Sequence, residues 1–143
     1  MTLKERNAYA AGLLDGEGYL GLIPRYQKEF EFVPLIKVAS TTYELLDFLY
    51  EEFGGHMDKE RQSKQANRKP SKMWTLKNRK AIIEFLFHVY PYLKVKKRQA
   101  DIIKEFITKA GTWRQTSTMT PEERKTLYLN LRKLNHRGLA TTE

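Results

Sequence analysis

The segment AAGLLDGEG, residues 10–18, constrains the fold more than any other stretch, because it starts like a helix yet carries three glycines. Thr2 and Glu5 have the spacing of a capping box, which predicts a helix that begins at Leu3 and stops at the glycines. Glycine inside a helix costs about 1 kcal/mol relative to alanine, so a close neighbour must offset that loss.

The small residues of this helix fall on one face. Ala8, Gly12 and Gly16 are four residues apart, so this face has almost no side chains. Two such helices can approach until their backbones touch. The natural neighbour is the same helix of a second copy, related by a two-fold axis. We therefore expect a homodimer with these three residues at its interface.

Glu17 follows this face directly, between Gly16 and Gly18. Across a two-fold axis two Glu17 carboxylates would meet, and they repel each other unless cations lie between them. Mg²⁺ prefers carboxylate and carbonyl oxygens, and the glycines let the Gly16 carbonyl approach such an ion. The plain alternative is an acid in a turn, although an acid at a helix C-terminus is unfavourable without a cation.

The rest of the chain alternates between strand and helix patterns. Local signals predict two strands, a helix, two more strands and three helices, at 19–27, 30–40, 41–53, 56–63, 71–77, 78–90, 96–109 and 120–135. The second helix would open on a capping box from Thr41 to Glu44. This order predicts an α+β fold with a four-stranded, largely antiparallel sheet, helices on one face and a C-terminal helix. We assign residues 1–111 to the core and 112–143 to a helical extension.

Positive charge is concentrated in the second strand pair. The chain has 26 Lys and Arg against 17 Asp and Glu, and residues 56–80 hold nine basic and two acidic side chains. A basic two-stranded ribbon suits the major groove of DNA, whereas the alternative is a solvated edge that resists aggregation. The predicted DNA-binding residues are Arg25, Gln27, Lys28, Lys37, Lys59, Arg61, Lys64, Arg68, Lys69, Lys72, Thr75 and Lys77.

The composition also excludes several classes. The chain has no cysteine, which rules out disulfides, zinc ribbons and Cys₂His₂ fingers. No apolar run approaches the ~18 residues of a membrane span, and the first ten residues lack a secretory h-region. We expect no membrane partner and an intracellular protein, in a bacterial or phage cytoplasm or in an organelle.

Two motifs together resemble one family. Residues 10–18 resemble the signature helix of the LAGLIDADG homing endonucleases, in the variant that ends GEG. Residues 91–99, PYLKVKKRQ, are similar to the family's P-x-L-x-x-K-x-x-Q segment. The resemblance covers about residues 6–110. A single copy of the first motif is typical of members that act as homodimers, although a pseudo-dimer with a different chain stays open.

The resemblance implies roles for individual residues. Glu17 matches the metal-binding acid and Gly16 the adjacent backbone carbonyl, while Asp15 matches an acid at the helix end and dimer interface. Lys96 matches the active-site lysine, which would position the attacking water or stabilise the charge of the phosphorane. Ser40 is the best match for a glutamine that many members carry before the second helix.

The resemblance also implies a reaction. Mg²⁺, with Mn²⁺ as a substitute, would assist hydrolysis of both strands of double-stranded DNA, leaving short 3′ overhangs. Two half-sites of about one helical turn each imply a near-palindromic target of about 20 bp. Family members that became RNA maturases, or that bind DNA without cutting it, offer the alternative function.

Overall fold

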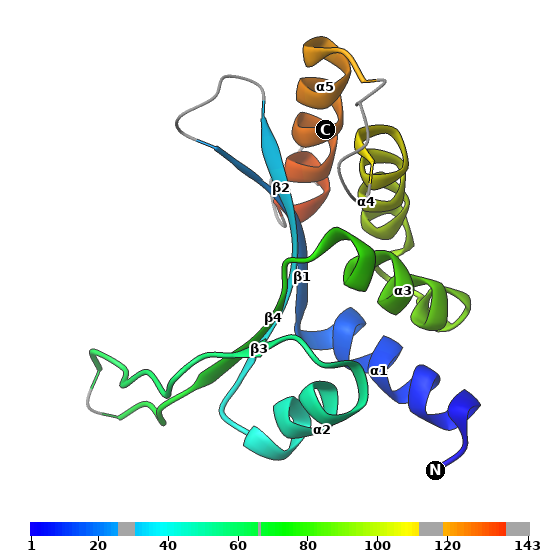
Figure 1. Ribbon diagram of the computed structural model, residues 1–143. Helices are drawn as coiled ribbons and strands as arrows, with labels where there is room; N and C mark the ends of the chain where they lie inside the picture. Colours follow the sequence, from blue (N-terminus) through cyan, green and yellow to red (C-terminus); the bar gives the residue numbers. More distant parts are fainter. Residues whose placement is uncertain (26–30, 66, 112–118, 137–143) are drawn as a thin grey trace.

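The computed structural model describes residues 1–25, 31–65, 67–111 and 119–136 (Figure 1). A four-stranded sheet has the helices on one face, and the segment between its third and fourth strands projects away from them. The α+β architecture is confirmed. The elements in chain order are α1 (Leu3–Glu17), β1 (Gly18–Pro24), β2 (Phe32–Ser40), α2 (Tyr43–Phe53), β3 (His56–Met57), β4 (Lys72–Leu76), α3 (Arg79–Val89), the 3₁₀ turn η1 (Tyr90–Tyr92), α4 (Lys97–Ala110) and α5 (Pro121–Asn135).

The sheet order is β1-β2-β4-β3, and every neighbouring pair is antiparallel. Gly18, the first residue of β1, pairs with Val38 of β2, and Ser40 at the end of β2 pairs with Lys72. The end of α1 leads straight into Gly18. Consequently the C-terminus of α1, the end of β2 and the start of β4 lie at one end of the sheet.

The core lies between the sheet and the helices. Alternate residues along the strands are buried in it, among them Leu20, Leu22, Ile36, Val38, Trp74 and Leu76. The indole of Trp74 lies 5.5 Å from the ring of Phe85, and its Nε1 donates to the Gly54 carbonyl at 2.7 Å. This bond satisfies the polar atom of a fully buried tryptophan, whose burial stabilises the fold by roughly 3 kcal/mol.

Three of the predicted helix starts are confirmed by their caps. Thr2 and Glu5 form the reciprocal capping box of α1, Asn78 accepts from the Ala81 amide at 3.0 Å, and Thr120 accepts from the Glu123 amide at 3.2 Å. The capping box predicted from Thr41 to Glu44 is wrong. The helix starts one residue later, because the Thr42 amide donates to Ser40 Oγ and forms a local turn.

α1 ends at Glu17, between Gly16 and its C-cap Gly18, so the predicted stop at the glycines is confirmed. One predicted strand is too long. The strand expected at 56–63 is reduced to two residues, and an isolated bridge between Arg61 and Ser71 continues the pairing further out. Most described side chains of this arm are exposed, so only the part beside the buried Trp74 is a regular strand.

The helix α5 packs on the free edge of the sheet. Asn135 Nδ2 donates to the Leu20 carbonyl of β1 at 2.8 Å, and the ring of Tyr128 stacks on Phe32 at 4.6 Å. α5 thereby covers an edge strand that could otherwise pair with another chain. No described helix is both long enough and apolar enough to cross a membrane.

Candidate functional site

Glu17 is exposed at the junction where α1 turns into β1. The next residue must be glycine, since a Cβ at Gly18 would lie 2.4 Å from Leu14 Cδ1 and 2.6 Å from the Leu14 carbonyl oxygen. This close contact allows the chain to pass from helix to strand in a single residue. The junction therefore places the Glu17 carboxylate at the rim of the sheet, in solvent.

The neighbouring acid, Asp15, is bound within the chain. Its carboxylate accepts hydrogen bonds from the amides of Lys94, Val95 and Lys96, at 2.8, 3.1 and 3.0 Å. These amides precede α4, whose N-cap residue Lys96 provides no side-chain cap of its own. Asp15 thus acts as the cap of α4 from about 80 residues away, in addition to the interface position that the sequence predicts for it.

Lys96 makes the return contact to α1. Its side chain is 5% exposed, and Nζ donates to the carbonyls of Leu14 and Asp15 at 3.0 and 2.8 Å. The Leu14 carbonyl also accepts from the amide of the C-cap Gly18, and a cation at this end of the helix complements the helix dipole. The predicted active-site lysine therefore lies beside the end of α1, with its ammonium group bonded to the backbone that leads to Glu17.

We call this pair of reciprocal contacts the Asp15–Lys96 latch. A carboxylate of α1 holds the start of α4, while the ammonium group that precedes α4 holds the end of α1. Five hydrogen bonds in all join two segments that are far apart in the sequence. Because Glu17 follows Asp15 by two residues, the latch fixes where the Glu17 backbone lies relative to the sheet.

Ser40 lies at the same end of the sheet, two residues beyond the strand residue that pairs with Gly18. It is half-buried, and its hydroxyl accepts from the Thr42 amide at 2.9 Å. This hydrogen bond shapes the turn into α2. A catalytic role for Ser40 stays a prediction.

The small-residue face of α1 is open. Ala8, Gly12 and Gly16 are all exposed, and a Cβ added at either glycine would meet nothing within 4 Å. The opposite face of the helix is buried through Ala10, Ala11 and Leu14. In the described part of the chain, nothing packs closely against these two glycines, so this face is free to contact another molecule.

The predicted DNA-binding side chains lie mainly along the sheet and the arm between β3 and β4. Lys37 lies over the ring of Tyr19, with 4.9 Å from Nζ to the ring centroid. Thr75 is only 5% exposed, because it lies in a central strand, paired with Lys37 on one side and His56 on the other. Exposed members of the set are Arg25, Lys59, Arg61, Lys64, Arg68, Lys69 and Lys77, while Gln27 and Lys28 lie outside the described residues.

The base of the arm is anchored by Tyr43. Its hydroxyl donates to the Glu60 carboxylate, and this hydrogen bond raises the pKa of Tyr43 to about 12. Lys72 lies over the same ring, with Nζ 4.7 Å from the ring centroid. The contacts connect the start of α2 with both sides of the arm, so they orient the basic side chains farther out.

No protein-family model and no curated protein matches this sequence significantly. Solved structures do match. The archaeal intron-encoded homing endonuclease I-Vdi141I, complexed with DNA, has a TM-score of 0.76 and 17% identity over 96% of this chain and 88% of its own.

Two further solved structures are similar to this chain. The homing endonuclease I-CvuI in complex with its target, in the presence of 2 mM Ca, has a TM-score of 0.62 and 18% identity over 94% of this chain and 97% of its own. The meganuclease I-SmaMI bound to DNA has the same TM-score and identity, but the match covers 87% of this chain and only 43% of that longer one. A further similar structure is a LAGLIDADG homing endonuclease, I-GzeII, in complex with its DNA target. The chain therefore has the fold of the LAGLIDADG homing endonucleases.

Proposed function

We propose that this chain is a site-specific endonuclease of the LAGLIDADG type that cuts double-stranded DNA as a homodimer. One observation carries the proposal: the exposed Glu17 carboxylate directly follows an open glycine face, so pairing two α1 helices through that face brings two carboxylates together. The fold supports it, because the similar structures are homing endonucleases in complex with DNA.

The donor atoms suit a divalent cation shared between two copies. In the described part of one chain, no three histidine or acidic side chains are grouped as a metal site. Glu17 and the Gly16 carbonyl offer hard oxygen ligands of the kind Mg²⁺ and Mn²⁺ accept, and a second copy and a DNA phosphate would add the others. Such an ion, when bound, would activate water and polarise the scissile phosphodiester.

The side chains of this protein would position the DNA around that centre. Lys96 holds the end of α1. As a positioning residue for Glu17, it would also add a positive charge near the scissile phosphate. The basic side chains on the sheet and the arm would neutralise backbone phosphates on each half-site. Two copies on one axis imply a near-palindromic target of about 20 bp and cuts that leave short 3′ overhangs.

The test maps cleavage ends in genomic DNA related to the source of the gene. Wild-type protein is incubated with Mg²⁺, with Ca²⁺ or without metal, alongside the variants Glu17→Gln and Glu51→Gln. Glu51 is an exposed acid of α2, so its variant makes the same change in charge away from the site.

We expect a few nearly palindromic cuts with Mg²⁺ for wild type and Glu51→Gln, and no cuts for Glu17→Gln. Cuts that survive in Glu17→Gln would refute the role of this carboxylate. Intact DNA under every condition, from protein that circular dichroism shows to be folded, would favour the RNA-maturase or non-cleaving DNA-binding function.

A further inference from the structure

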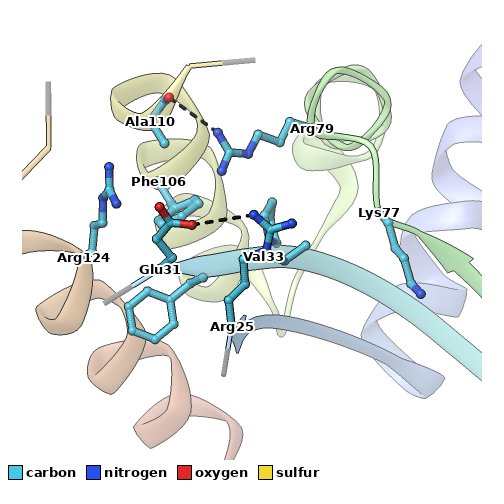
Figure 2. A pocket seen from close by; sticks show the side chains of 10 residues that line it. Arg25, Glu31, Val33, Lys77, Arg79, Phe106, Ala110 and Arg124 are labelled. Atoms are coloured by element: carbon cyan, nitrogen blue, oxygen red, sulfur yellow. Dashed lines mark hydrogen bonds and ion pairs between the residues drawn. The ribbon is translucent and has the colours of Figure 1, made fainter. Parts of the chain in front are cut away.

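A second charged site lies at the opposite end of β2 from Glu17. Here β4 has already ended, and a pocket of about 260 Å³ opens between β2, the start of α3, the end of α4 and the start of α5 (Figure 2). We call it the arginine pocket, because Arg25, Arg79 and Arg124 line it, with Glu31, Lys77 and Phe106. Arg124 does not stand out in the sequence, and Arg79 stands out only as one of the nine basic residues of the segment 56–80.

The positive charge in the pocket exceeds the negative charge. Among the described residues that line it, Glu31 is the single acid, and it is 3.6 Å from the guanidinium of Arg25, which is 60% exposed. Figure 2 shows this pair pointing toward the space below Arg79, with Arg124 on the other side of the Glu31 carboxylate. Besides the exposed ion pair between Arg25 and Glu31, the guanidinium groups of Arg79 and Arg124 therefore also line the pocket.

Arg79 is held so that its charge stays in the pocket. Its Nη1 donates to the Gly111 carbonyl at 2.9 Å, and the guanidinium lies 5.5 Å from the ring centroid of Phe106. Burial lowers the pKa of Arg79, and the charges of Arg124 and Arg25 lower it further, while Glu31 opposes them. The neighbouring cations thus repel one another here more than the carboxylate compensates.

Arg124 adds an unused donor. Its Nε is buried, and it has no hydrogen-bond partner among the described residues. A buried N–H without an acceptor costs about 1–3 kcal/mol, and more when the group is charged. An oxyanion in the pocket would supply the missing acceptor and would neutralise the repulsion around Arg79.

We propose that the arginine pocket binds a phosphate oxyanion. Guanidinium groups present paired N–H donors that match two oxygens of a phosphate, and several of them around one hollow can hold a dianion. The volume is below the roughly 300–1,000 Å³ of sites for drug-sized ligands, so it fits a single phosphate group better than a whole nucleotide.

The phosphate could belong to the DNA backbone or to a free phosphorylated molecule. The pocket begins at Phe32, six residues along β2 from the partner of Gly18, which places it about 20 Å from the Glu17 end. A DNA phosphate bound here would therefore flank the target and would not be the scissile one. The phosphate site does not rest on the nuclease activity, because its test involves no cleavage.

The experiment follows the arginine Nε–H resonances of ¹⁵N-labelled protein during titration with sodium phosphate at constant ionic strength. Sodium chloride serves as the matched titrant. Arg124→Gln removes one donor group, and Lys80→Gln makes the same charge change at an exposed residue of α3 outside the lining. Glu31→Gln removes the carboxylate that competes with the phosphate.

We expect a saturable shift of the Arg79 and Arg124 resonances with phosphate and none with chloride. Binding should weaken about 10-fold in Arg124→Gln, stay unchanged in Lys80→Gln, and tighten several-fold in Glu31→Gln. Arginine shifts that chloride reproduces would overturn the proposal. So would phosphate affinity that stays the same in both Arg124→Gln and Glu31→Gln.

A duplex oligonucleotide then identifies the source of the phosphate. If the duplex shifts the same arginine resonances and weakens the response to free phosphate, the pocket holds a backbone phosphate. If the duplex binds without moving them, the pocket takes a free phosphorylated molecule. Either result supports the phosphate site, and neither depends on whether Glu17→Gln abolishes cleavage.

Discussion

The Asp15–Lys96 latch predicts that an acid in the signature helix stabilises the whole domain. In Asp15→Ala, the amides of residues 94–96 lose the carboxylate that accepts from them, and α4 loses its cap. The amides of Lys94 and Val95 are exposed and can bond to water, whereas that of Lys96 is partly buried and cannot do so fully. A lost cap costs about 1–2 kcal/mol, and a partly buried donor without an acceptor adds about 1 kcal/mol.

We therefore expect Asp15→Ala to lower the free energy of unfolding by about 2–3 kcal/mol, which is roughly 6–9 °C in Tm for a chain of this length. Asp15→Asn keeps one acceptor oxygen and should lose only about 1 kcal/mol, because asparagine also caps helices well. Asp47→Ala is the matched control, since Asp47 is an exposed acid of α2. Its effect should stay within about 0.5 kcal/mol.

Urea unfolding monitored by circular dichroism measures all three variants. Adding Lys96→Met and the double variant gives a double-mutant cycle across the latch. Since either substitution alone separates α1 from the start of α4, the two losses should not add, and the coupling should be at least about 1 kcal/mol. The reasoning is refuted if Asp15→Ala is no more destabilising than Asp47→Ala, or if the two latch substitutions are additive.

Three further predictions concern other parts of the molecule. Gly12→Leu should keep the monomer folded, because a Cβ there meets nothing within 4 Å, but should abolish dimerisation as measured by analytical ultracentrifugation. Absorbance at 295 nm should show a tyrosine with a pKa of about 12, which is missing from Tyr43→Phe and falls toward 10 in Glu60→Gln. The hydrogen bond from Tyr43 to Glu60 therefore stabilises the arm below pH 10, and this stabilisation is lost between pH 10 and 12. The hydrogen bond from the Thr2 amide lowers the pKa of Glu5 from 4.5. The start of α1 should therefore fray as the pH falls below 4.5 and Glu5 becomes protonated, and hydrogen exchange of the Arg6 amide measures this fraying.

Local sequence signals predict the elements of this fold well, because their causes are local. The caps at Thr2, Asn78 and Thr120 each involve residues three apart, and the inward faces of the strands follow from simple alternation. The prediction for β3 fails where the cause is not local. Its residues have strand character, but beyond Met57 most of the side chains are exposed and do not join the core that holds a regular strand.

The contact between Asp15 and the start of α4 is not readable from the motif that contains Asp15. A different stretch does carry a signal for it. The residues before α4 read Lys-Val-Lys, and Lys97 and Arg98 follow, so the helix has neither a capping side chain nor an acid in its first turn. Such a start is unfavourable for both the free amides and the dipole. It predicts that a remote carboxylate completes the cap, without saying which one.

The arginine pocket is harder to predict from the sequence than the Asp15–Lys96 latch. Arg79 and Arg124 belong to different helices, and nothing in the sequence indicates that they come together. Their charges come together only because β4 is shorter than β2, which leaves room for α3, α4 and α5 to meet beside the exposed part of β2. Register and strand length set this geometry, and both depend on packing across the whole sheet.

The helix α1 contributes to the stability of the chain through one face and, in the proposed homodimer, to assembly through the other. Ala10, Ala11 and Leu14 pack inward and Asp15 caps α4, so the inner face of α1 fixes Glu17 relative to the sheet of its own chain. In the proposed homodimer, the open glycine face would fix Glu17 relative to the second copy. If both constraints are needed for cleavage, a variant of the latch and a variant of the glycine face should abolish it for different reasons. The latch variant would lose activity in proportion to its loss of stability, whereas the glycine variant would lose it while the monomer stays as stable as wild type.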